Sequence, residues 1–429
     1  MEPSQTTIIT NGRLVTPEKV LDAGSVVIEA GRIVEINERL YPANSHTLDA
    51  KGNFIMPGVI NLHDDSYEKT LQPRKGVFLP PELAFHQMEG ALATAGVTRT
   101  YHAVSFDAGI FLRDRTVANA EAMANQLLEF SNSDFAFLHH HLLYRCDLRS
   151  AGAFDGILRV MQNPLAAELT HYLSLNDHSP GQGQYAQRPV LRKMIKSLLG
   201  PAGNSEEVVD ARENELWQLK AQTEQIREHQ LNQATALLQN TPGIIIAGHD
   251  DDSAATVNDL YRRGIRVCEF PINLEAATRA KELGLPVIAG SPNIVRGGSH
   301  TGNISVMEFI QQNLLDVLVA DYAPSTLLHA IFMLVEQKVM SLVEAVKLVT
   351  TNAAKVVGLE KVTGSLEPGL LADLIVVETR TKPQLYIVRK LLISGKPVSV
   401  SSLAAYPDAH HFSAQPSSLA PLTQSLGKK

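Results

Sequence analysis

Short apolar runs separated by turn-forming dipeptides mark both ends of the chain. TTIIT, GSVVIEA and RIVEI are β-prone, and the dipeptides Asn11-Gly12 and Ala30-Gly31 are turn signals beside them. ADLIVVE and YIVRKLLISG resume the pattern near the other end. Neither end shows helical periodicity, so we expect segments 1–56 and 360–402 to pair into one small β-sandwich.

The central segment, residues 57–359, alternates short apolar strands with amphipathic helical stretches, which is typical of parallel β/α units. Eight strands can be counted, at 59–65, 97–104, 137–147, 169–178, 243–250, 265–272, 286–293 and 316–322. Eight parallel strands are enough to close a barrel. The sequence therefore predicts an α/β protein: a TIM-like (β/α)8 barrel with a small β-sandwich domain formed by the N- and C-terminal segments.

Two segments fall outside this scheme. Residues 205–240 are long, charged and helix-prone, and they are inserted after the fourth predicted strand. A solvated outer pair of helices is the favoured interpretation, and a lid or a contact that would make a homodimer is the alternative. Residues 403–429 are rich in Ser, Ala, Pro and Gln, and we expect them to form a polar tail without catalytic residues.

The composition narrows the class of function. The chain has 429 residues, 44% hydrophobic and 19% charged, as folded globular proteins do. Its net charge of −7 argues against binding to nucleic acid or anionic membranes. Cys146 and Cys268 are too few for a disulfide framework. Because there is neither a bilayer-spanning apolar run nor a signal-peptide pattern, we expect a cytoplasmic protein without membrane contact.

Histidines and aspartates recur where the predicted strands end, and in a parallel barrel these ends form the active site. One such residue is more often structural, but several crowded at one mouth would repel one another unless a cation collects them. A ligand set of imidazole and carboxylate groups without thiolate suits one or two divalent ions. Zinc is the first choice, and manganese or iron are the alternatives. The predicted ligands are His63, Asp65, His178 and His249, with Asp147 as a bridge between ions and Asp321 as ligand or general base.

Other histidines are interpreted as structural. The run His139-His140-His141 lies mid-strand, before Asp147, so we expect it near the bottom or middle of the barrel wall. His86 and His102 are interpreted in the same way.

The segment SPNIVRGGSHTGN follows the seventh predicted strand and resembles an anion-binding loop. Its glycines let backbone N–H groups turn toward a phosphate, and phosphate sites in such barrels commonly use the loops after strands seven and eight. A plain flexible loop is the alternative. The predicted phosphate contacts are Arg296, Gly297, Gly298, Ser299, His300 and Asn303, with Arg74 and Lys75 adding positive charge.

Two motifs resemble the amidohydrolase superfamily. PGVINLHDD at 57–65 is similar to its first-strand signature, and GSLEPGLLADLIVVE at 364–378 is similar to its closing motif. LYRCDL, DHSPGQ and SPNIVRGGSH further resemble a phosphonate-metabolism subgroup. The resemblance implies hydrolysis of a ribose 5-triphosphate to the 5-phosphate and pyrophosphate, with a small phosphorylated sugar as substrate. The chain departs from the superfamily pattern at Asp65, where the second histidine of the first strand usually stands, and at the proposed bridge, Asp147.

Two other functions stay open at this point. The more common chemistry of the superfamily is hydrolysis of an amide, a cyclic amide or an amino-purine, in which case the glycine-rich loop would hold a substrate carboxylate. The other is a metal-binding subunit without catalysis, which the retention of Asp321 together with the other predicted ligands disfavours.

Overall fold

The computed structural model describes residues 6–42, 44, 46–74, 76–109, 115–298, 304–382 and 384–398. The predicted polar tail, residues 403–429, lies outside the described residues. The described chain contains two sheets, each of eight strands.

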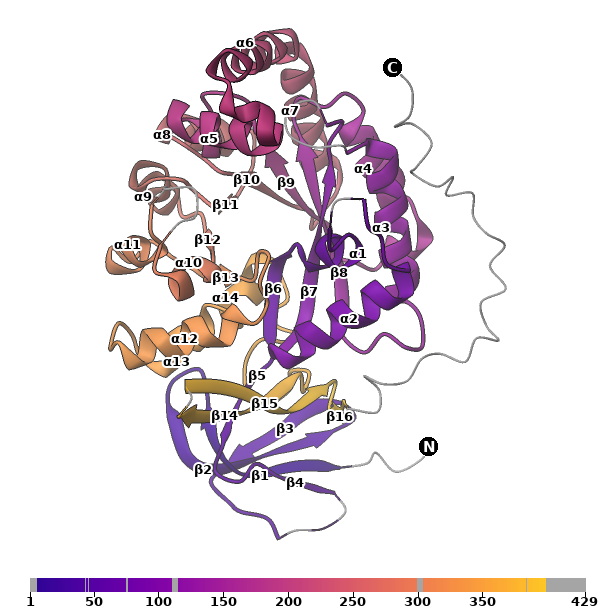
Figure 1. The fold of residues 1–429 in the computed structure, drawn as a ribbon. Helices are drawn as coiled ribbons and strands as arrows, with labels where there is room; N and C mark the ends of the chain where they lie inside the picture. The colour runs from indigo at the N-terminus through magenta and orange to yellow at the C-terminus, as the bar shows by residue number, and fades with distance from the viewer. Residues whose placement is uncertain are drawn as a thin grey trace. The chain divides into compact units, whose positions relative to one another are not determined.

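Parallel strands paired in chain order form the barrel wall, and helices surround them (Figure 1). The strands are β6 (Val59–Asp64), β7 (Val97–Phe106), β8 (His139–Asp147), β9 (Tyr172–Asn176), β10 (Ile245–His249), β11 (Val267–Glu269), β12 (Val287–Gly290) and β13 (Val317–Val319). Each overlaps one of the eight predicted strands. The predicted (β/α)8 barrel is therefore confirmed.

The barrel closes where β6 meets β13. The N–H of Asp65 donates to the carbonyl oxygen of Asp321 at 2.9 Å, and the N–H of Asp321 donates to the carbonyl oxygen of His63 at 3.0 Å. The side chain of Asn61 adds a third link by accepting the N–H of Ala320 at 2.9 Å. These bonds make the first and last barrel strands neighbours at their carboxyl ends.

Apolar side chains fill the inside of the barrel below this rim. Leu62, Tyr101, Leu143, Tyr172 and Val319 belong to one buried cluster. Because side chains pack this interior, we expect ligands to approach the polar strand ends from the mouth of the barrel.

Helices cover the outside of the wall, and the segment predicted as an insertion forms the helices α6 (Glu206–Gln222) and α7 (Glu224–Asn240). The other α-helices of the described residues are α1 (Ser66–Leu71), α2 (Pro81–Thr94), α3 (Val117–Ser131), α4 (Ala153–Met161), α5 (Arg188–Leu199), α8 (Ala254–Arg262), α9 (Leu274–Glu282), α10 (Ser291–Arg296), α11 (Val306–Gln311), α12 (Thr326–Glu336), α13 (Leu342–Lys347) and α14 (Thr351–Val356). Among the residues described, no helix combines the length and the apolar character that crossing a bilayer requires.

The two ends of the chain share the second sheet. Its strands are β1 (Thr7–Val15), β2 (Val20–Glu29), β3 (Arg32–Asn37), β4 (Thr47–Asp49), β5 (Phe54–Pro57), β14 (Leu374–Thr381), β15 (Gln384–Ile393) and β16 (Lys396–Pro397). The N-terminal β5 pairs with the C-terminal β14, with Ile55 opposite Val376. Ile9, Val26 and Leu374 pack in a core separate from that of the barrel. This confirms the predicted pairing of the termini, whereas the predicted boundaries at 56, 360 and 402 stay predictions.

Candidate functional site

A polar cavity of about 340 Å3 opens at the carboxyl ends of the barrel strands. Five of the side chains that line it are histidines or aspartates, namely His63, Asp65, His249, Asp250 and Asp321. The cationic residues Lys69, Arg145 and Arg296 line the same cavity. A concave pocket with converging polar groups is the first place to expect catalysis in a barrel of this kind.

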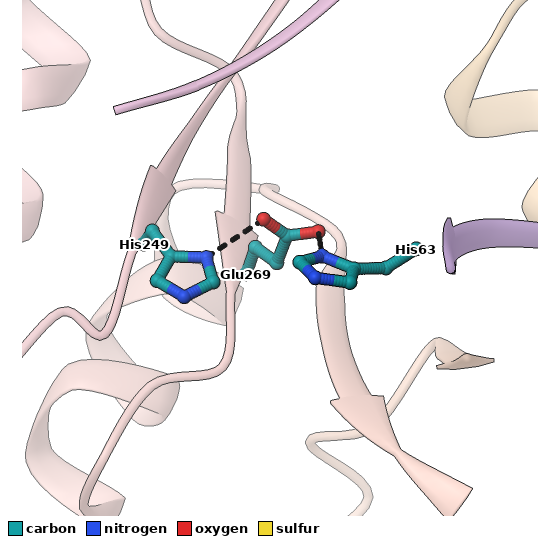
Figure 2. Close-up of side chains that lie close together, drawn as sticks. All are labelled: His63, His249 and Glu269. Carbon is teal, nitrogen blue, oxygen red and sulfur yellow. Dashed lines mark hydrogen bonds and ion pairs between the residues drawn. The ribbon is translucent and has the colours of Figure 1, made fainter. Parts of the chain in front are cut away.

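Glu269, at the end of β11, lies between two of the histidines and contacts both (Figure 2). Its Oε1 lies 3.0 Å from Nδ1 of His63, and its Oε2 lies 2.9 Å from Nδ1 of His249. Ser174 donates a further hydrogen bond to Oε2 at 2.6 Å. A carboxylate that accepts a hydrogen bond from Nδ1 fixes the orientation of the ring and leaves Nε2 as the atom that an ion can deprotonate and bind.

The carboxylate of Glu269 and the ring of His63 shift each other's pKa values toward the charged forms. Burial by itself would lower the pKa of His63, but the carboxylates of Glu269 and Asp65 outweigh burial and raise it to about 10. Burial likewise would raise the pKa of Glu269, yet His63 and His249 hold it well below its usual value. The fully buried Glu269 is therefore ionised, as a residue that orients the two rings must be.

Three groups among the described residues have the geometry to hold a metal ion: His63–His249–Glu269, His178–His249–Asp250 and His63–Asp65–Asp321. In each group the ligand atoms lie within 4.8 Å of one another. Nε2 of His63 and Oδ1 of Asp65 are 3.4 Å apart. Ligand atoms bound tetrahedrally at roughly 2.1 Å are about 3.4 Å apart, so nitrogen and oxygen donors at this spacing fit a divalent ion.

Three of the nine non-glycine residues that have a positive φ in the described part of the chain lie at the same rim. Asp250 follows β10 with φ of 58°, Phe270 follows β11 with φ of 53°, and Asp321 follows β13 with φ of 53°. A positive φ is uncommon for residues other than glycine and persists only where the surrounding structure holds it. Two of these three residues are carboxylates of the candidate metal groups, which indicates that the strain serves to aim them.

The structure brings five of the six predicted metal residues together but not Asp147. Within the described residues, Asp147 belongs to none of the three groups and does not line the cavity. Its Oδ1 accepts the N–H of Arg149 at 2.9 Å. Burial, with the nearby charges of Asp107 and Asp177, raises its pKa to about 7. Arg145, two residues earlier on the same face of β8, reaches the centre instead.

The other histidines lie elsewhere in the barrel wall. Nδ1 of His102 contacts Asp64 at 3.1 Å, and its Nε2 contacts Nδ1 of His140 at 2.9 Å. His140 in turn contacts Glu89 at 3.0 Å. His139 begins β8 and His141 stacks on Tyr101. None of these histidines appears in the three metal groups of the described residues.

The predicted anion-binding loop begins as a helix. Residues 291–296 form α10, which ends at Gly297 with φ of 78°. Arg296 and Gly298 line the cavity, and Gly297 does not. Ser299, His300 and Asn303 lie outside the described residues, as does Lys75. Arg74 is exposed and does not line the cavity, whereas Lys69 in α1 does.

Four charged residues of the cavity or of the metal groups are absent from the predicted site: Lys69, Arg145, Asp250 and Glu269. Two of them carried a sequence signal. Asp250 directly follows the predicted ligand His249, and Glu269 interrupts the apolar strand IRVCEFPI much as Asp321 ends its own strand. Lys69 stands four residues after Asp65, one helical turn away, and its Nζ lies 3.6 Å from Asp65 Oδ2.

Comparison with known proteins agrees with this geometry. Residues 219–406 match the model of the amidohydrolase family. The chain is 32% identical over 382 residues to alpha-D-ribose 1-methylphosphonate 5-triphosphate diphosphatase of Escherichia coli (strain K12), covering 87% of this chain and 95% of that protein. It is 24% identical over 402 residues to 5'-deoxyadenosine deaminase of Methanosarcina barkeri (strain Fusaro / DSM 804), covering 87% and 84% of the two chains.

Solved structures show the same fold. Dihydropyrimidinase from Brevibacillus agri NCHU1002 superposes with a TM-score of 0.56 at 13% identity, covering 92% of this chain and 95% of the other. The barrel with its terminal sheet, the histidines and carboxylates at the rim, and a relative that matches nearly end to end agree with one another. This chain therefore belongs to the amidohydrolase superfamily and is a hydrolase.

Proposed function

We propose that this hydrolase is metal-dependent and releases pyrophosphate from alpha-D-ribose 1-methylphosphonate 5-triphosphate in phosphonate catabolism. One observation carries the proposal: the cavity joins a histidine–aspartate centre to three cationic side chains, Lys69, Arg145 and Arg296. A polyphosphate needs both features, a cation-binding centre at the scissile bond and positive charge along its length. The E. coli relative, whose name specifies this reaction, supports the choice of substrate.

The donor set fits zinc first, with manganese or iron as alternatives, because imidazole and carboxylate without thiolate suit these ions. His63, Asp65 and Asp321 would hold an ion on one side of the centre, and His178, His249 and Asp250 offer a second group. A divalent ion there supplies Lewis acidity, which makes water a stronger nucleophile and stabilises negative charge on phosphoryl oxygens.

The chain itself contributes a base and an anion clamp. Burial, together with the charge of Asp65, raises the pKa of Asp321, which strengthens Asp321 as a proton acceptor. In the proposed reaction Asp321 accepts a proton from water while the water oxygen bonds to the phosphorus nearest the sugar. The bond from that phosphorus to the bridging oxygen breaks, and pyrophosphate leaves. Arg145, whose Nη1 lies 3.6 Å from Asp65, would hold phosphoryl oxygens next to the reacting atoms.

Deamination or amide hydrolysis is the second candidate, favoured by the similarity to 5'-deoxyadenosine deaminase over 402 residues. The two candidates make different demands on the cavity. A neutral nucleoside or cyclic amide gains little from three cations, whereas a triphosphate carries several negative charges to pair with them.

Product analysis separates the candidates. The purified protein, loaded with zinc, is incubated in parallel with alpha-D-ribose 1-methylphosphonate 5-triphosphate, with 5'-deoxyadenosine and with dihydrouracil. We expect stoichiometric pyrophosphate from the first compound and neither ammonia nor ring opening from the others. Ammonia or ring-opened product without pyrophosphate would replace the proposed function by the second candidate.

A further inference from the structure

The loop that carries His178 is held on one side by the α6–α7 hairpin. This loop, residues 177–186, follows β9 and contains two glycines with positive φ, Gly181 at 71° and Gly183 at 51°. His178 belongs to a candidate metal group, with its Nε2 3.8 Å from Oδ2 of Asp250. A glycine-rich loop loses conformational entropy when it is ordered, so a ligand on such a loop needs external anchors.

The first anchor is Asp177, the residue directly before His178. Its carboxylate accepts hydrogen bonds from Nε of Arg149 at 2.9 Å and from Nε of Arg227 at 3.2 Å. Gln182 adds a bond at 2.9 Å, and the N–H of Ser179 adds one at 3.1 Å. Hydrogen bonds to a charged group are stronger than those between neutral groups. Here they hold the carboxylate of Asp177, before His178, and link it to Ser179 and Gln182, after His178.

The arginines tie this carboxylate to the hairpin. Arg227 is part of α7. Nη1 of Arg149 donates to the carbonyl oxygen of Lys220 at 2.8 Å and to Oε2 of Glu224 at 3.0 Å, which are residues on either side of the turn between the two helices. Only 1% of Arg149 is exposed, so its guanidinium is shielded from solvent.

The second anchor lies further along the loop. Nζ of Lys220 donates to the carbonyl oxygen of Pro180 at 2.8 Å. The ring of Trp217 lies against Gly181 so closely that a Cβ added there would be 2.6 Å from the indole. On the opposite side, the N–H of Gly183 donates to Oδ2 of Asp252 at 3.0 Å, just beyond β10. The loop is therefore held between the hairpin and the strand end that carries His249 and Asp250.

We propose that the α6–α7 hairpin is a positioning element for the metal centre: through Asp177 and Gly181 it presents His178 to the ion. Arg149 and Arg227 are then positioning residues, which touch neither ion nor substrate. The inference rests on the metal centre of the proposed function and adds a role for the inserted helices. It predicts that damage to the anchors weakens metal binding while the barrel stays folded.

The first test removes one anchor from the hairpin. Arg227→Ala is compared with Arg212→Ala, which breaks an ion pair with Glu215 inside α6 that does not reach the loop. The zinc dissociation constant is measured by chelator competition, and thermal unfolding of the metal-free protein is measured alongside. We expect binding to weaken by roughly 10- to 100-fold in Arg227→Ala, as for other residues that orient ligands, and to be unchanged in Arg212→Ala. Arg227→Lys, which keeps a charge opposite Asp177, should recover part of the affinity.

A second pair of variants tests the Trp217 contact. Gly181→Ala places a methyl group against the indole, whereas Gly243→Ala carries a similar φ of 80° with no atom within 4 Å of the added Cβ. Only Gly181→Ala should weaken zinc binding, and the fluorescence of Trp217, the single tryptophan of the chain, should shift in that variant alone. Wild-type affinity in both Arg227→Ala and Gly181→Ala would overturn the positioning role. A wild-type protein that binds no ion would overturn the proposed metal centre and this role with it.

Discussion

Oε2 of Glu269 lies 2.9 Å from Nδ1 of His249, and the other oxygen of this carboxylate holds His63 in the same way. The two rings come from β6 and β10, the first and fifth strands of the barrel, so one buried carboxylate sets the orientation of both. Their Nε2 atoms are thereby the ring nitrogens left to bind an ion.

Replacing Glu269 by Gln tests this relationship. A glutamine side chain has one carbonyl oxygen, so one of the two histidines loses its acceptor and with it the fixed tautomer. We expect zinc affinity to fall by roughly 10- to 100-fold, measured by chelator competition.

The matched control is Glu89→Gln. Glu89 is equally buried and contacts a histidine, His140, at the same 3.0 Å distance, but outside the centre. It should lose stability without a change in zinc affinity. Equal losses of affinity in both variants would mean that Glu269 acts on the fold rather than on the ion.

Asp321→Asn tests the proposed base. Asparagine keeps one oxygen for an ion but cannot accept the proton of water, so turnover should fall by about 10²- to 10⁴-fold with metal content largely retained. Asp316→Asn is the control, because Asp316 lies just before the same strand, at its other end, and pairs with Lys281. Unchanged turnover in Asp321→Asn would exclude Asp321 as the base.

Arg145→Met tests the anion clamp. Arg145 lines the cavity, and its Nη2 is 3.5 Å from Nε2 of His249. A hydrogen bond to a charged group contributes about 1.5–3 kcal/mol, so the KM for the triphosphate should rise by roughly 10- to 150-fold. Arg74→Ala should leave KM unchanged, because Arg74 does not line the cavity. A larger rise in KM for Arg74→Ala than for Arg145→Met would instead support Arg74 as the substrate contact, as predicted from the sequence.

Asp147→Asn tests whether Asp147 bridges metal ions. The pKa of Asp147 is raised from 3.8 to about 7, so between those values the folded chain keeps a proton that the unfolded chain releases. The stability that this proton contributes is complete below pH 4 and is lost as the pH rises through 7. Asparagine cannot ionise, so the Asp147→Asn variant does not lose this stability as the pH rises.

We therefore expect metal-free Asp147→Asn to be more stable than the wild type at pH 8, by about 4 kcal/mol, with a smaller difference at pH 5. Urea unfolding at the two pH values measures this. Zinc content should be unaffected, whereas loss of zinc would establish Asp147 as a ligand.

The contrast between Arg145 and Asp147 illustrates what the sequence could not determine. Alternation along β8 places both side chains on one face, and the sequence pattern indicates that face correctly. Which of the two reaches the centre depends on the stagger between neighbouring strands, and Asp147 is paired with Asn176 at the far end of β9. The stagger of a barrel is a property of its closure and leaves no local trace in the sequence.

The sequence alone indicated three of the candidate ligands, because each is a polar side chain at the end of an apolar strand, which is a local signal. They are His63, His249 and Asp321. Glu269 carries the same signal, yet its role depends on His63, which is 206 positions away in the chain. The proposed role of α6 and α7 could not be predicted from the sequence either. It depends on contacts of Arg149 and Arg227 with the loop 177–186, which are formed only in the folded chain.

In the proposed centre His63, Asp65 and Asp321 share one cation, and anomalous X-ray diffraction from crystals grown with zinc would locate that cation. We expect an anomalous peak within about 2.0–2.3 Å of Nε2 of His63 and of an oxygen of Asp65 or Asp321, with at least one zinc per chain by elemental analysis. A zinc-soaked crystal without a peak at the barrel rim, from protein that retains no zinc, would show that these three residues do not share a cation.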